Sequence, residues 1–171
     1  MNKKNIIASL IVLLALQAAV IAYLYRPTDK QTAPTVALMD TLEPQKLSSL
    51  SITDENGSVV SLRKHGSEWV VGEDEFPADQ KSVEDIIKKI AGLESARLVS
   101  RTKSSHNRLK VGDAIFNRKV VCTSETGDST FFMGTAPSSK SVHFRVAGQN
   151  EVYQVQGISA WELQAERDSW W

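Results

Sequence analysis

The groups in this chain that are best suited to chemistry are a lysine-serine loop, three histidines and a run of carboxylates. The loop formed by residues 134–141 ends in Lys-Ser, as phosphate-binding loops do, but position 139 is Ser where such loops carry their second glycine. The residues after it predict a strand, whereas phosphate is held by the N-terminal N–H groups of a following helix. We therefore predict no nucleotide site here.

The remaining reactive side chains match no catalytic or metal-binding pattern. His65, His106 and His143 are far apart in the sequence, while zinc sites usually include one close pair of ligands. The carboxylates of residues 73–75 are adjacent, and we expect a solvated turn there rather than two acids facing across a cleft. Cys122 is the single cysteine and lies in an apolar run. We therefore predict no metal, no cofactor and no enzymatic activity.

A cationic stretch between Arg97 and Lys119 is the least ordinary charged feature. It contains seven cations and one acid, Asp113. Such a surface could bind an acidic partner, anionic lipid headgroups or an acidic glycan, or it could be a solvated linker that pairs with the acidic first half of the chain. Aromatic residues do not alternate with the cations as a stacking platform requires, so we predict no nucleic-acid partner. The seven cations are Arg97, Arg101, Lys103, Arg108, Lys110, Arg118 and Lys119.

Three of the four tryptophans lie in the last eleven residues, at Trp161, Trp170 and Trp171. Exposed tryptophans near a terminus favour a protein interface or the membrane–water boundary. For Trp161 the spacing equally allows docking onto the domain itself, whereas we expect Trp170 and Trp171 to lie at an interface.

The charge of the chain is balanced in total and uneven in detail. Its 171 residues carry 20 basic and 20 acidic side chains, which excludes a globally basic or acidic protein. Residues 1–26 carry +3, residues 27–96 carry 7 − 13 = −6, residues 97–119 carry 7 − 1 = +6, and residues 120–171 carry 3 − 6 = −3. An acidic segment thus precedes the cationic one.

The elements that would position these groups begin with an apolar segment. Residues 6–25 contain no charge, and a helix of 20 residues spans about 30 Å, the thickness of a bilayer core. The run is longer than the apolar core of a signal peptide, although cleavage remains the alternative. Lysines precede it, so the positive-inside tendency places the N-terminus in the cytoplasm. We expect a single-pass anchor in a bacterial inner membrane within residues 1–26, a stalk over residues 27–35 and an exported domain over residues 36–171.

The exported domain is predicted to be α+β. Alternating apolar residues and turn signals predict a largely antiparallel β-meander. A long amphipathic helix is expected over about residues 79–94 with Asp79 as its N-cap, and a short C-terminal helix over residues 159–167. The expected strands cover residues 47–52, 58–62, 68–71, 96–100, 118–124, 129–133, 142–146 and 151–155.

Several of these features follow one another in a recognisable order: the hairpin ending at Leu62, Trp69, the helix start at residues 77–79, the segment 105–114, Gly134, Arg145 and the strand at residues 152–153. This order resembles the family catalogued as domain of unknown function 4340. The resemblance covers about residues 45–165. It implies one N-terminal membrane helix, a domain facing away from the cytoplasm, and a neighbouring ABC-type transporter similar to those of gliding motility. It implies no catalytic residues.

These features together predict a non-catalytic, membrane-anchored periplasmic domain that acts by binding. We expect an accessory subunit of a membrane assembly such as an ABC-type transporter. Two other functions stay open: an envelope hydrolase or glycan-processing enzyme with a dispersed site, and a structural envelope protein that associates with itself.

Overall fold

A computed structural model describes residues 12–21, 36–39 and 42–171. The chain divides into two units, residues 1–32 and 33–171. In the first, residues 12–21 are helical, and apolar side chains such as Leu14 and Leu16 are exposed. Within the described ranges no helix is long and apolar enough to cross a membrane. Much of the predicted span 6–25 and all of the predicted stalk 27–35 lie outside the described residues.

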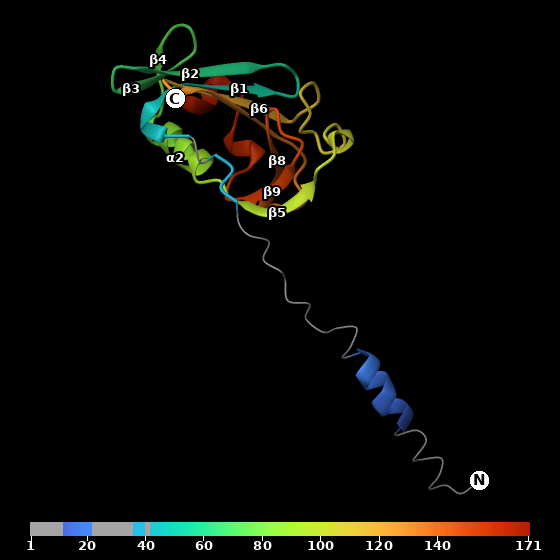
Figure 1. Cartoon of the computed structure of the whole chain (residues 1–171). Coiled ribbons are helices and arrows are strands. Elements are labelled where there is room, and N and C mark those ends of the chain that lie inside the picture. Colours follow the sequence, from blue (N-terminus) through green and yellow to red (C-terminus); the bar gives the residue numbers. More distant parts are fainter. Residues whose placement is uncertain (1–11, 22–35, 40–41) are drawn as a thin grey trace, which may run out of the picture. The chain divides into compact units, whose positions relative to one another are not determined.

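The second unit is built on one sheet of nine strands in the order β4-β3-β2-β1-β6-β7-β8-β9-β5 (Figure 1). Neighbouring strands are antiparallel throughout. The elements are η1 (Pro44–Lys46), β1 (Leu47–Asp54), β2 (Val59–His65), β3 (Glu68–Val71), β4 (Phe76–Pro77), α2 (Gln80–Ala91), β5 (Ser95–Ser100), η2 (Lys103–Ser105), β6 (Arg118–Ser124), β7 (Gly127–Met133), β8 (Ser141–Val146), β9 (Val152–Gln156), η3 (Ala160–Glu162) and η4 (Arg167–Trp170). The predicted α+β class and antiparallel β-meander are thereby confirmed.

The first hairpin follows from its turn residues. Gly57 adopts φ +87°, which side chains with a Cβ rarely tolerate. Asp54 Oδ1 accepts hydrogen bonds from the backbone N–H groups of Asn56 at 2.9 Å and Ser58 at 2.8 Å. The sequence did not predict β4, which is two residues long and forms one edge of the sheet. An edge position tolerates Pro77 because its missing N–H leaves no gap in an inner ladder.

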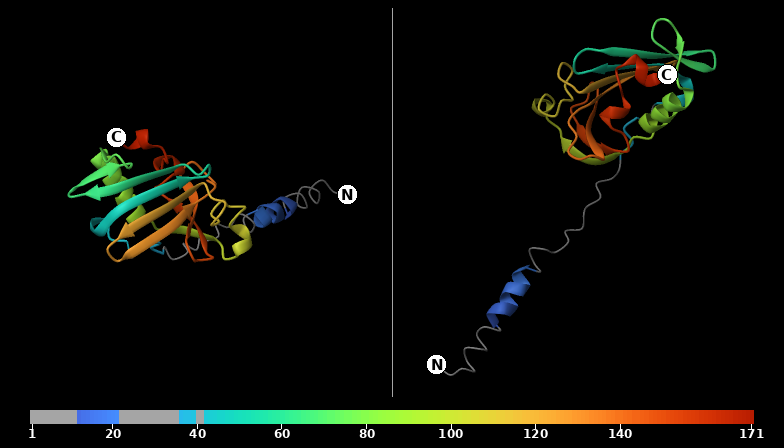
Figure 2. Two further views of the ribbon diagram at one scale, coloured as in Figure 1. Left: turned by 90° about the horizontal axis from the view of Figure 1, so that it is seen from above. Right: turned by 180° about the vertical axis from the view of Figure 1, so that it is seen from behind.

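Helix α2 lies where the amphipathic pattern predicts a helix. Asp79 is its N-cap, and Asp79 Oδ1 accepts from the N–H groups of Lys81 at 3.1 Å and Ser82 at 3.3 Å. The helix ends at Ala91 before Gly92, three residues earlier than expected. Its apolar face is buried in the main core, around which the sheet curves in Figures 1 and 2. The buried residues of this face are Val83, Ile86, Ile87 and Ile90.

Residues 101–117 cover the opposite face of the sheet and enclose a second small core. Leu109, Val111, Phe132 and Val152 form this core. The segment approaches β7 so closely that a Cβ on Gly134 would lie 2.8 Å from the carbonyl oxygen of Lys110. The cationic stretch is therefore no linker, because its middle is packed on the sheet.

The C-terminal segment differs from its prediction. Two separate 3-10 turns, η3 and η4, replace the helix expected over residues 159–167. Between them Leu163 is fully buried with φ −109° and ψ 65°, outside the helical region, and its carbonyl accepts from Arg118 Nε at 2.7 Å. Burial of the Leu163 side chain in the core therefore outweighs the helix propensity of residues 159–167.

The prediction that Trp170 lies exposed at an interface is also wrong. This side chain is 3 % exposed in the main core, and its Nε1 donates to the carbonyl oxygen of Gln164 at 2.9 Å. Trp171 is 56 % exposed and packs edge-on against Phe76 with 5.1 Å between the ring centroids.

Candidate functional site

The structure separates the seven predicted cations into two groups. Arg97 on β5 and the following Arg101, Lys103 and Arg108 are exposed, and within the described residues no ion pair involves them. We call these four side chains the cationic face. They lie on the edge strand β5 and on the segment that covers the outer side of the sheet.

The other three cations lie elsewhere, and two have partners. Lys110 Nζ pairs with Glu55 at 2.8 Å. Arg118 donates to the carbonyl oxygens of Leu163 and Asn117, at 2.7 and 2.8 Å. Lys119 is half-buried on β6.

His143 connects the cationic face to the sheet. In the sheet His143 lies opposite Gln154 of β9, and Gln154 lies opposite Arg97 of β5. The three residues therefore form one row across three strands. His143 Nδ1 lies 2.8 Å from Thr135 Oγ1. Burial is the main cause that lowers the pKa of His143, and the positive charges of Arg97 and Arg108 lower it further, while a hydrogen bond with the Thr135 backbone opposes this. The site thus holds a neutral imidazole beside two arginines at pH 7.

Arg145 is a buried cation that sequence reasoning did not single out as a site residue. It is 2 % exposed, and its guanidinium lies 4.6 Å from the centroid of the Phe132 ring. Nε donates to the Val111 carbonyl at 2.6 Å, Nη1 to the Gln149 carbonyl at 3.1 Å and Nη2 to Asp113 Oδ1 at 2.7 Å. Because every donor group of Arg145 has an acceptor, this arginine fastens the outer segment to β8.

A second surface surrounds η3, where Trp161 is 81 % exposed. The Ser-x-x-Glu pattern of residues 159–162 forms a capping box, in which Glu162 Oε2 accepts from the backbone N–H of Ser159 at 2.9 Å. Burial opposes ionisation of Glu162, but the bonds from Lys89 and Ser159 outweigh it and hold the pKa of Glu162 below its usual value. This pattern was the one signal in the sequence for a short rigid turn that presents Trp161.

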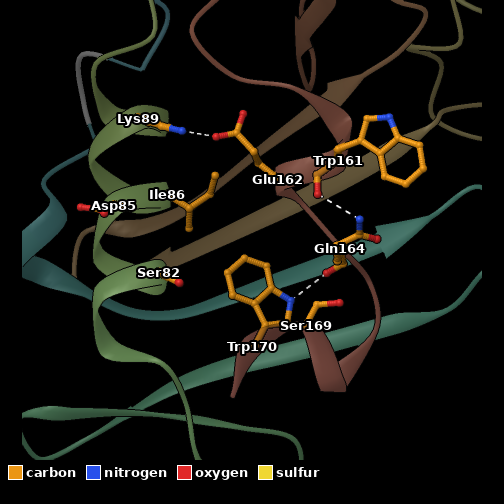
Figure 3. A pocket seen from close by; sticks show the side chains of 9 residues that line it. All are labelled: Ser82, Asp85, Ile86, Lys89, Trp161, Glu162, Gln164, Ser169 and Trp170. Carbon is orange, nitrogen blue, oxygen red and sulfur yellow. Dashed lines mark hydrogen bonds and ion pairs between the residues drawn. The ribbon is translucent and has the colours of Figure 1, made fainter.

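One hollow of about 310 Å³ lies between α2 and residues 161–170. Figure 3 shows Lys89 and Glu162 paired across its top and the ring of Trp170 at its base. Gln164 Nε2 donates to the Trp161 carbonyl at 3.0 Å, so the turn is tied to the segment below it. In the same view the ring of Trp161 points away from α2.

A second hollow of about 370 Å³ lies beside η3, and we call it the serine hollow. Neither cations nor carboxylates line it. Its polar and aromatic lining consists of Asn117, Ser138, Ser139, Ser141, Ser159 and Trp161. The residues from 134 to 141, whose phosphate-loop likeness we rejected, thus form one wall of a cavity.

The remaining candidates from the sequence are metal ligands, Cys122 and the acidic run of residues 73–75. Within residues 12–21, 36–39 and 42–171, no cluster of three ligand-type side chains could hold a metal. Burial raises the pKa of the Cys122 thiol to about 12, so it stays protonated. The acidic run lies at the surface, where Asp74 pairs with Arg167 at 3.0 Å and Glu75 with His65 at 3.2 Å.

A family model described as "Domain of unknown function (DUF4340)" matches residues 69–171, well over half of the chain. The match begins at residue 69, later than the start near residue 45 that the resemblance predicted, so β1 and β2 lie before it. It extends to residue 171, beyond the predicted end near residue 165. No curated protein matches the chain, and no solved structure does.

Proposed function

The chain belongs to the family described as a domain of unknown function (DUF4340), and from that premise we propose that it is a non-catalytic binding domain held at the bacterial inner membrane. In this proposal residues 6–25 are the anchor, the N-terminus is cytoplasmic, and the folded domain is periplasmic. The domain acts as an accessory subunit of a membrane assembly, such as an ABC-type transporter, by docking on an acidic surface of its partner.

The observation that carries this proposal is the cationic face. Four exposed cations lie within twelve residues, and in the described part of the chain none has a carboxylate partner. Asp113 is the one acid of the stretch, and Arg145 already occupies it. Unpaired charge of one sign attracts an oppositely charged surface and sets the orientation of encounter.

The attachment of the chain to the domain is consistent with this role. The Val36 N–H donates to Ser95 Oγ at 3.0 Å, and the Val36 carbonyl accepts from the Ser95 N–H at 2.9 Å. The chain therefore enters the domain beside the first residue of β5, the strand that carries Arg97. Ten residues, 26–35, separate Val36 from the proposed anchor, and such a segment reaches at most about 36 Å.

A charge-reversal experiment tests the proposal. The full-length chain is purified from membranes in mild detergent, and recovered membrane proteins are compared between wild type and Arg101→Glu/Lys103→Glu. We expect the variant to lose at least about tenfold of the partner, because the attraction becomes repulsion. Added salt should weaken the wild-type complex through screening.

The matched control is Lys64→Glu/Lys81→Glu, which changes the net charge equally at exposed positions on β2 and α2. It should retain the partner. Equal recovery by all three proteins, or no membrane partner of the wild type, contradicts the proposal.

A further inference from the structure

We propose that the serine hollow binds a neutral saccharide, with one sugar ring stacked on the indole of Trp161. This inference goes beyond the proposed function, since it concerns the opposite end of β8 and β9 from Arg145 and uses none of the cationic face. It rests on the lining of the cavity, on the buried Oδ1 of Asn117, on a serine hydroxyl hydrogen that no described residue accepts, and on the exposure of Trp161.

The size and lining of the hollow set the class of ligand. Its volume of about 370 Å³ lies within the usual range of ligand sites, roughly 300–1,000 Å³. Because no charged side chain lines it, the cavity offers no charged partner to a phosphate, a carboxylate or an amine, so it favours a neutral ligand. Its lining combines serine hydroxyls with the apolar surfaces of Val142 and Ile158. A ligand with many hydroxyl groups and an apolar face is complementary to such a lining.

Asn117 supplies an acceptor that lacks a donor. Its Nδ2 donates to the Gly134 carbonyl at 2.9 Å, and this bond fixes which end of the amide is oxygen. Its Oδ1 is shielded from solvent and receives no hydrogen bond from any described residue. A buried acceptor without a partner costs about 1–3 kcal/mol, so a ligand hydroxyl that reaches Oδ1 after a small side-chain rotation would recover that loss.

Ser138, which is exposed, and Ser141 supply a hydroxyl hydrogen that no described residue accepts. Their hydroxyl oxygens are 2.8 Å apart, so one of the two hydrogens is used between them. Ser141 Oγ also accepts from Gln154 Nε2 at 2.9 Å, and Ser138 Oγ accepts from the Lys140 N–H at 3.4 Å. Whichever serine donates to the other, the second hydrogen finds no acceptor within the described residues. The lining therefore offers one hydroxyl donor, and it gains an acceptor when the Asn117 side chain rotates to expose Oδ1, as a sugar hydroxyl network requires.

Trp161 supplies a flat apolar surface at the rim. Its backbone is held by the capping box and by the bond from Gln164, so little conformational freedom would be lost on binding. An aromatic ring has a negative face, which attracts the slightly positive C–H groups on the face of a sugar ring. An indole exposed to 81 % loses apolar contact with water when such a ring covers it.

The test measures binding of three neutral disaccharides, maltose, cellobiose and N,N′-diacetylchitobiose, to the full-length chain by calorimetry. The chain is held in phospholipid nanodiscs, because sugar-headed detergents would compete. We expect at least one disaccharide to bind. Trp161→Ala should weaken it at least tenfold, and Ala136→Leu should do the same because position 136 is exposed and lines the hollow, where the larger side chain fills space.

Trp171→Ala is the matched control, since it removes an exposed tryptophan that does not line the hollow, and its affinity should equal that of the wild type. Because Ala136→Leu changes only a surface position, it keeps the test valid even if Trp161→Ala unfolds. The inference is wrong if no disaccharide binds, if both hollow variants bind as the wild type does, or if an uncharged peptide such as Ala-Gly-Ser-Ala binds instead. These outcomes are independent of partner recovery in the charge-reversal variants.

Discussion

Arg145 explains how a segment rich in cations stays attached to the sheet. The outer segment contributes few apolar side chains to its small core, so hydrophobic burial alone holds it weakly. Arg145 adds bonds to the Val111 and Gln149 carbonyls and to Asp113. Of these groups Asp113 remains largely solvated, with 68 % of its side chain exposed, whereas the guanidinium is buried.

At this scale the first prediction concerns Arg145→Met, which keeps the apolar stem and removes the charge. The Val111 and Gln149 carbonyls would lose their charged donor, and we expect a loss of about 2–3 kcal/mol in the free energy of unfolding. Asp113 would return to water with little penalty because it is exposed. Denaturant unfolding followed by tryptophan fluorescence measures the change, and a loss below about 0.5 kcal/mol would contradict the role given to Arg145.

A second prediction follows from Asp113. The hydrogen bond from Arg145 holds the pKa of Asp113 below its ordinary value of 3.8. A carboxyl group whose pKa is lower in the folded state stabilises the protein above pH 3.8, and this contribution is lost as the pH falls through the folded pKa. Asp113→Asn should therefore be less stable than wild type at pH 7, and the difference should vanish in acid below the folded pKa. A difference that is independent of pH would refute this origin.

At the scale of single residues, the sequence identified candidate side chains but did not predict which of them are exposed. Composition identified the seven cations and the terminal tryptophans, but which of them are exposed depends on contacts distant in the chain. Trp170 is buried because its backbone carbonyl accepts from the Asp79 N–H at 2.7 Å and its ring enters the core, and no local pattern encodes that pairing. The serine hollow likewise joins Asn117 to residues from 134 to 161.

Among the elements, those with a strong local signal were predictable. Period-two alternation with glycine turns predicted eight strands, and a capped amphipathic stripe predicted α2. The misses were β4, which is too short to show a period, and the C-terminal helix. There the capping box predicts a start, but burial of Leu163 between Arg118 and the core prevents the helix from continuing.

Gly134 provides a prediction at the scale of elements. Alanine at this position would place its Cβ against the backbone carbonyls of Leu109 and Lys110, which cannot rotate away as side chains do. The outer segment would have to move, and we expect Gly134→Ala to cost about 1–3 kcal/mol and to speed amide hydrogen exchange in residues 103–117.

Gly92→Ala serves as the control for that prediction. Gly92 has φ −87°, and the nearest atom to an added Cβ is the Lys88 carbonyl at 3.3 Å, so its effect should be small. Equal effects of both variants on exchange in residues 103–117 would contradict the close approach at Gly134.

At the scale of the whole molecule, the order of the strands in the sheet could not be predicted from local sequence patterns. A meander predicts neighbours in sequence, yet β5 follows α2 and pairs with β9 at the far edge. The reason is that α2 crosses the concave face and covers the main core, which brings the chain to the other side of the sheet (Figure 2). This crossover places β5 and Arg97 at a free edge, where charged side chains also discourage pairing with other chains.

The placement of the domain outside the cytoplasm, part of the proposed function, gives the last prediction. Cys122 is fully buried and its thiol is protonated, so the native chain should not react with a membrane-impermeant maleimide in intact cells with a permeabilised outer membrane. Glu125→Cys adds a thiol at the exposed turn between β6 and β7. We expect this variant alone to be labelled before the inner membrane is broken. Labelling of the variant only after lysis would place the domain in the cytoplasm, and labelling of the native chain would show that the β6 core is open.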